Sequence, residues 1–131
     1  MGSRPTFKEG IMTKYPLTWP TGWKRRESYR RDPAQFSKDK RPLSVYDGTQ
    51  RVLSELRRFG VVESDTIIST NMQLRRDGLP LSNQAEPSDP GVAVYWKKYG
   101  KDQVMATDRY TKVADNLAAI AASLEAIRAI E

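Results

Sequence analysis

Five aspartates carry the chemistry that would matter most if this chain were an enzyme. Converging carboxylates can hold Mg²⁺ and support phosphodiester cleavage, and the candidates are Asp65, Asp77, Asp89, Asp102 and Asp108. Their spacing does not require convergence, because loops, a hairpin turn and a helix start explain such residues equally well. The chain has no histidine and no cysteine, which excludes disulfides, thiolate or imidazole zinc sites, and catalytic triads built on those residues. We therefore predict a protein that is not an enzyme and uses no metal or cofactor.

The stretch YPLTWPTGWKRRESYRR, residues 15–31, combines aromatic rings with a dense basic cluster. Indole rings can stack on bases, and guanidinium and ammonium groups contact phosphates. This pattern predicts a nucleic-acid-binding site made of Trp19, Trp23, Lys24, Arg25, Arg26, Arg30 and Arg31. The alternative is that the tryptophans are buried and anchor an irregular segment, while the cations form a solvated surface.

A second polar stretch, STNMQLRRDGLP at residues 69–80, places hydroxyl, amide and guanidinium groups at the end of an expected strand. Such donors can hold a phosphate or carboxylate, so we add Arg75 and Arg76 to the predicted nucleic-acid site. The alternative is turn chemistry, since Asp-Gly is a turn signal and Ser, Thr and Asn satisfy loose backbone groups.

The net charge of +6 is unevenly distributed along the chain. Residues 1–60 hold 14 Lys and Arg against 6 Asp and Glu, whereas residues 61–131 hold 8 against 10. A basic half joined to a nearly neutral half indicates a surface that faces a polyanion. No apolar run approaches the roughly 20 residues of a membrane span, so we predict a protein with no membrane partner.

The elements that must position these residues follow from periodicity and turn signals. We expect a helix over 44–60, capped by Ser44 with Asp47, a strand over 65–71, a hairpin over 91–110 and a second helix over 111–131. We expect the hairpin turn, KYGKD, to be longer than the tightest two-residue type. The apolar stripes of the two helices are Val45, Val52, Leu53, Leu56 and Phe59, and then Val113, Leu117, Ile120, Leu124 and Ile127.

This order predicts an α+β fold: a small antiparallel three-stranded sheet with two helices on one face, in the order α-β-β-β-α. Residues 12–43, interrupted by four prolines, are predicted to form an irregular aromatic and basic arm, and residues 44–131 the α+β domain. Residues 1–11 are interpreted as an extension or as residues added for expression.

The second helix is rich in alanine, which leaves part of its surface small and weakly polar. The apolar seam of this helix favours packing onto the core. The alternative is that the seam binds a helical partner or a second copy of the chain. For that alternative we name the face that bears Ala118, Ala122 and Ala129 as partner-binding.

Four blocks, YPLTWPTGWKRR, ISTNMQLRRDGLP, DPGVAVYW and ATDRYTKVADNLAAIAASLEAIRAIE, together resemble a family of uncharacterised proteins from bacterial and phage mobile elements. Members often carry the label J-domain-containing, and the resemblance covers about residues 15–131. It implies a bacterial or phage cytoplasm. In relatives the chain continues and can end in a J-domain with a His-Pro-Asp signature, which a chain without histidine cannot carry. The resemblance transfers no catalytic residue.

We therefore predict a non-enzymatic, cytoplasmic accessory protein of a phage or mobile element that binds DNA or RNA mainly through the phosphate backbone. The alternative is a protein-interaction adaptor, acting on a host factor or defence system or serving as the front half of a split co-chaperone.

Overall fold

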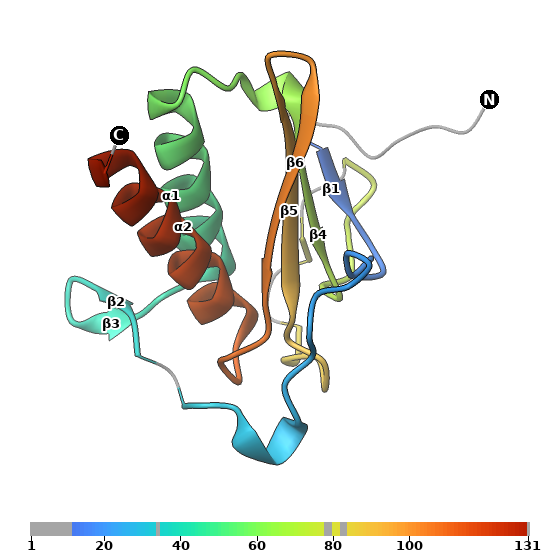
Figure 1. Ribbon diagram of the computed structural model, residues 1–131. Helices are drawn as coiled ribbons and strands as arrows, with labels where there is room; N and C mark the ends of the chain where they lie inside the picture. The colour runs from blue at the N-terminus through green and yellow to red at the C-terminus, as the bar shows by residue number, and fades with distance from the viewer. Residues whose placement is uncertain (1–11, 34, 78–79, 82–83, 131) are drawn as a thin grey trace.

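The computed structural model describes residues 12–33, 35–77, 80–81 and 84–130. A four-stranded sheet in the spatial order β1-β4-β5-β6 has two helices packed against one face (Figure 1). These elements are β1 Met12–Lys14, β4 Thr66–Thr70, β5 Val92–Lys98, β6 Lys101–Thr107, α1 Val45–Arg58 and α2 Val113–Ile130. The described chain also has a small hairpin, β2 Ser37–Lys38 with β3 Arg41–Pro42, and single turns of 3-10 helix at Ser28–Arg30 (η1) and Glu63–Asp65 (η2). The predicted α+β class is confirmed.

The predicted three-stranded antiparallel sheet is wrong in one respect, because the sheet has a fourth strand. Strand β1 pairs with β4 in parallel, with Met12 opposite Ile67 and Lys14 opposite Ser69. The other two pairings, β4 with β5 and β5 with β6, are antiparallel as expected. Parallel neighbours need a crossover connection, and here the rest of the arm together with α1 provides it. Three residues are too few to show a strand period, so β1 was not predicted.

The predicted helices form with the predicted signals. Ser44 Oγ accepts a hydrogen bond from the Asp47 N–H at 3.0 Å, and the Asp47 carboxylate accepts one from the Ser44 N–H at 3.3 Å. This reciprocal capping box begins α1, and Gly60, with a φ of +86°, follows its end. In α2 the predicted seam is buried as far as Leu124, but Ile127 is 40 % exposed because its side of the helix is not covered there.

The hairpin turn is shorter than predicted. Lys98 pairs with Lys101, so the loop has two residues, Tyr99 and Gly100, with φ values of 54° and 73°. Positive φ at both loop positions is the geometry of the tight turn that best matches the twist of two antiparallel strands. Tyrosine adopts positive φ rarely, which is why the sequence favoured a longer loop.

The core lies between the helices and the inner face of the sheet. It contains Leu53 and Leu56 from α1, Val94 from β5, and Leu117 and Leu124 from α2, each at most 2 % exposed. Because side chains alternate along a strand, Ser69 of β4 and Tyr95 of β5 point to the outer face of the sheet. This outer face carries the N-terminal arm.

Replacing Gly48 by alanine should destabilise the protein. A Cβ atom at Gly48 would lie 2.8 Å from Leu117 Cβ and 2.9 Å from the Ala114 carbonyl oxygen, so α1 and α2 would have to separate. Overpacking costs about 1–3 kcal/mol, which outweighs the roughly 1 kcal/mol that alanine gains in helix propensity. Urea denaturation should show a net loss, whereas Gln50→Ala, an exposed control in the same helix, should change stability by less than about 0.5 kcal/mol. A more stable Gly48→Ala protein would contradict this packing.

Candidate nucleic-acid interface on the N-terminal arm

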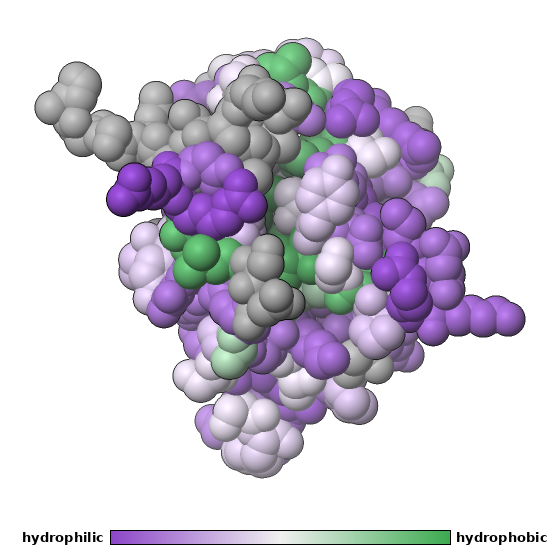
Figure 2. All heavy atoms as spheres, turned by 180° about the vertical axis from the view of Figure 1, so that it is seen from behind, coloured by the Kyte–Doolittle hydropathy of each residue, from purple (hydrophilic) through white to green (hydrophobic). Residues whose placement is uncertain are grey.

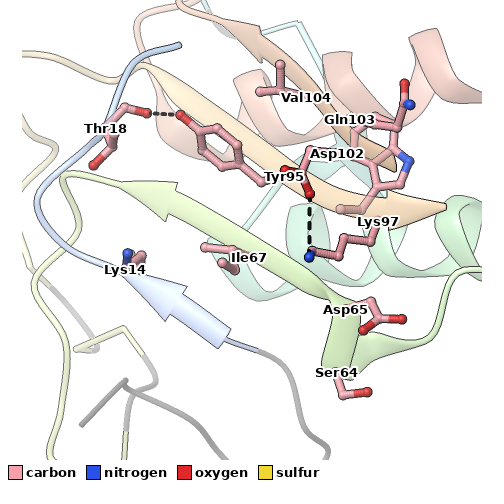
Figure 3. Close-up of a pocket in the computed structure, with 11 residues that line it drawn as sticks. Lys14, Thr18, Ser64, Asp65, Ile67, Tyr95, Lys97, Asp102, Gln103 and Val104 are labelled. Carbon is pink, nitrogen blue, oxygen red and sulfur yellow. Dashed lines mark hydrogen bonds and ion pairs between the residues drawn. The ribbon is translucent and has the colours of Figure 1, made fainter. Parts of the chain in front are cut away.

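The first part of the arm crosses the outer face of the sheet and is fixed there by hydrogen bonds. The Thr18 N–H donates to Ser69 Oγ at 2.7 Å, and the Tyr95 hydroxyl donates to the Thr18 carbonyl at 2.6 Å (Figure 3). The Leu17 N–H donates to Asn71 Oδ1 at 2.9 Å. Burial of the Tyr95 ring raises the pKa of its hydroxyl, so it remains a protonated donor to the arm at neutral pH.

The polar side chains at the start of the stretch 69–80 form hydrogen bonds to the protein's own backbone. Ser69 and Asn71 bind the arm, and Thr70 Oγ accepts the Met72 N–H at 3.0 Å. Arg75 forms an ion pair with Asp77, which neutralises its charge, whereas Arg76 is exposed. Ser69, Thr70 and Asn71 thus bind backbone groups, as the turn-chemistry interpretation expected, whereas the Asp-Gly turn includes Gly78, which lies outside the described residues. Of the two arginines, Arg76 stays a candidate for anion binding.

Two of the predicted phosphate-binding arginines are ion-paired to the body of the protein. The buried carboxylate of Asp108 accepts hydrogen bonds from Arg25 Nε at 2.9 Å, from Arg31 Nη2 at 3.3 Å and from the Arg26 N–H at 2.9 Å. Arg25 also pairs with Asp89, and Arg31 Nη2 lies 3.7 Å from the same carboxylate. The prediction that both arginines face solvent is therefore wrong for Arg31, whose side chain is 8 % exposed. The charges of Arg25 and Arg31 are both neutralised by Asp89 and Asp108.

The electrostatics of this cluster agree with its geometry. Burial alone would raise the pKa of Asp89, but hydrogen bonds from Arg25 and the Gly91 N–H, with the charges of Arg25 and Arg31, lower it below its ordinary value. Burial likewise opposes the charge on Arg25, yet its bonds to Asp89 and Asp108 raise its pKa. Both partners are thus charged at neutral pH, and the pair joins the arm to the body.

The close approach of the arm also depends on Gly91. A Cβ atom there would lie 3.1 Å from Leu17 Cδ2 and 3.2 Å from both Arg25 Nη2 and Asp89 Oδ1. A larger side chain would therefore push the arm away from the carboxylates that bind it.

The end of the arm is fixed to the start of α2. The buried carboxylate of Asp115 accepts hydrogen bonds from the Gln35 N–H at 3.1 Å and the Phe36 N–H at 2.9 Å. The rings of Phe36 and Tyr110 meet edge to face, with centroids 5.7 Å apart. In residues 12–33 and 35–43 the regular elements are β1, η1 and the β2–β3 hairpin, and the segment is bound to the body at both ends.

The tryptophans take part in the arm's own structure. Trp19 Nε1 donates to the Trp23 carbonyl at 2.9 Å, and the Arg25 guanidinium stacks over the Trp19 ring at 4.2 Å. One face of that ring is therefore occupied, which favours the anchoring interpretation for Trp19. Trp23 is 40 % exposed and keeps ring surface available to a ligand.

Three of the predicted cations of the arm are both exposed and without an acidic partner among the described residues. Lys24, Arg26 and Arg30 form no ion pair with any acid in the described part of the chain. They line a shallow depression of about 440 Å³ between the arm and the end of β6. Its other charged lining residues are Arg25, Arg109, Glu27 and Asp108, so five cations face two acids, and Asp108 is already paired with Arg25. Arg109 was not predicted. Its Nε forms an ion pair with Asp32 at 3.0 Å, and its position directly after Asp108 was the available signal.

The five aspartates that were considered as candidate metal ligands do not come together as a group. Asp89 and Asp108 both contact Arg25, Asp102 lies 3.8 Å from Lys97 Nζ, and Asp77 pairs with Arg75. Among the described residues, no cluster of three or more acidic side chains could hold a metal ion. The carboxylates that do converge are occupied by arginine.

A larger depression, of about 770 Å³, lies on the remaining part of the outer sheet face (Figure 3). Its floor is formed by Ile67, Tyr95 and Val104, and its charged lining residues are Lys14, Lys97, Asp65 and Asp102. Two cations face two acids, so this surface does not attract a polyanion. Viewed from behind, the described surface is mostly hydrophilic, and hydrophobic residues are visible in small areas (Figure 2).

The three alanines of the predicted partner-binding face of α2 differ in exposure. Ala118 is 2 % exposed and packs with Leu43 and Ala114, so its inclusion in an exposed docking face is wrong. Ala122 and Ala129 are exposed. Ala118 is buried because the arm, through Leu43 and Phe36, covers this side of α2.

Comparison with known proteins finds no protein-family model that matches the chain, and no match among curated proteins or solved structures. The resemblance to mobile-element proteins therefore stays a prediction. No helix in the described ranges has the length and apolar character needed to cross a membrane.

Proposed function

We propose that the protein is a non-enzymatic nucleic-acid-binding module that contacts the phosphate backbone of DNA or RNA with the exposed cations of its arm. The observation that carries this proposal is the depression beside β6, where Lys24, Arg26 and Arg30 have no acidic partner among the described residues. The role as an accessory protein of a phage or mobile element, in a bacterial cytoplasm, follows from the family resemblance and belongs to the same proposal.

The arrangement supports phosphate contact more than base recognition. The binding cations are fewer than the sequence indicated, since Arg25 and Arg31 position the segment and Lys24, Arg26 and Arg30 are left to contact a ligand. Because Trp19 is already stacked on Arg25, Trp23 is the indole left for a base. With three or four phosphates contacted, the affinity for a single strand should fall about 20- to 50-fold between roughly 50 and 200 mM salt.

The decisive variant reverses the three free cations, Lys24→Glu, Arg26→Glu and Arg30→Glu. We expect its affinity for a labelled single-stranded DNA or RNA of roughly 20 nucleotides, measured by fluorescence anisotropy, to fall at least about tenfold further than that of a charge-matched control. The control reverses Arg57, Arg58 and Lys97, three exposed cations at the ends of α1 and β5. These ends of the two elements lie at the opposite end of the molecule from residues 24–30 (Figure 1). Arg25 and Arg31 are left intact because they hold the arm in place.

Equal losses in the two variants would show that binding depends on net charge and has no site on the arm. Absence of binding by the unmodified protein at low salt would exclude the proposal. Thermal melting of both variants separates loss of binding from loss of folding. The arm variant should melt as the unmodified protein does, and the control should be slightly less stable because its three cations form exposed ion pairs.

A further inference from the structure

An apolar groove opens at the end of the molecule where both helices finish. The tip of the β5–β6 hairpin and the last turns of α2 lie at this end (Figure 1), and the groove that their side chains line measures about 420 Å³. Leu124, 1 % exposed, belongs to its floor, and Phe59, Trp96, Met105 and Ile127 are among the side chains around it. This surface is separate from the arm, and the proposed function does not use it.

The groove continues the hydrophobic core outward. Phe59, Trp96 and Met105 pack against the buried core cluster on one side and remain partly exposed on the other. Ile127 is the last member of the apolar seam of α2, and no described segment covers it. An apolar surface that is continuous with the core and open to solvent is typical of a docking site.

The charges around the groove have one sign. Lys98 and Lys101, which flank the hairpin turn, are the charged residues among its described lining, and no acid lines it. Lys98 Nζ lies 4.8 Å from the centroid of the Phe59 ring and 5.3 Å from that of the Tyr99 ring, so the ammonium group is held at the edge of the apolar surface. A ligand that fills the groove therefore meets two positive charges at its rim.

We propose that this groove binds a short segment of a partner protein that presents two or three large apolar side chains flanked by carboxylates. The apolar side chains would contact Leu124 and Ile127, and the carboxylates would pair with Lys98 and Lys101. A second copy of this chain does not fit as well, because two such rims facing each other would bring like charges together. Nucleic acid does not fit either, because Lys98 already occupies the Phe59 ring face on which a base would stack.

The test is a selection from a displayed library of random peptides of about 12 residues against the intact protein, followed by anisotropy with the enriched peptides. We expect enrichment of sequences that combine large apolar residues with Asp or Glu, and we expect Ile127→Glu to weaken their binding at least about tenfold. The matched control is Ile130→Glu, three residues further along α2, which is 83 % exposed and does not line the groove. It should bind as the unmodified protein does.

A second variant examines the charge requirement. Lys98→Glu with Lys101→Glu should weaken the acidic peptides at least about tenfold, whereas the arm variant Lys24→Glu, Arg26→Glu and Arg30→Glu should bind them normally. The proposal is overturned if no peptide is enriched, if enriched peptides show no acidic bias, or if Ile127→Glu binds as well as Ile130→Glu. Displacement of the peptides by single-stranded DNA would also overturn it and would assign the groove to nucleic acid.

Discussion

Replacing Asp108 by alanine should cost about 3–5 kcal/mol of folding free energy. The carboxylate is 5 % exposed and binds two guanidinium groups and one backbone N–H. Removing it leaves the largely buried Arg31 with only its longer, 3.7 Å contact to Asp89, beside an unpaired N–H of Arg26. Since small domains unfold at a cost of about 5–15 kcal/mol, the loss should lower the urea midpoint severely and release the arm from the sheet.

The matched control for this prediction is Asp102→Ala. Asp102 is also ion-paired, to Lys97, but its side chain is 85 % exposed, so removing it should cost at most about 1 kcal/mol. A double variant, Asp108→Ala with Arg31→Leu, should be less destabilised than the two single changes added together, because it leaves less buried charge unpaired. If Asp108→Ala costs no more than Asp102→Ala, the cluster does not hold the arm.

Replacing Asn116 by alanine should have a comparable effect, again about 3–5 kcal/mol, because each unsatisfied buried polar group costs about 1–3 kcal/mol. Asn116 is fully buried at the first turns of α2. Its Oδ1 accepts the Tyr110 N–H at 2.9 Å, and its Nδ2 donates to the carbonyls of Pro90 and Tyr110 at 2.9 and 3.0 Å. This one side chain joins the segments before β5 and after β6 to the helix.

Thermal or urea unfolding measures this loss directly. Ser123→Ala, an exposed change in the same helix, should alter stability by less than about 0.5 kcal/mol. Asn116→Asp keeps the acceptor for Tyr110 but lacks the two donors, so it should also be strongly destabilised. A mild effect of both Asn116 variants would mean that water replaces the lost bonds.

The parts of the fold that the sequence predicted are those in which neighbouring residues carry the signal. The capping box of α1, the buried seams of both helices and the alternation in the β5–β6 hairpin each depend on residues within a few positions of one another. Such patterns are visible in a single sequence because helix and strand periods are short.

The parts that the sequence did not predict depend on distant partners. Arg25 binds Asp89 and Asp108, which are 64 and 83 residues away along the chain, and no periodicity records which acid meets which arginine. For this reason the composition of the arm predicted more phosphate-binding cations than the three that have no acidic partner among the described residues. Strand β1 was missed for a related reason, since its partner β4 lies beyond α1 in the chain.

Strand β1 has a consequence for solubility. It covers one edge of β4, whose backbone N–H and C=O groups would otherwise offer a template to a strand from another molecule. Any change that detaches the arm, such as loss of Asp108, should therefore do more than lower stability: it should promote intermolecular strand addition, and aggregation should begin at the uncovered β4.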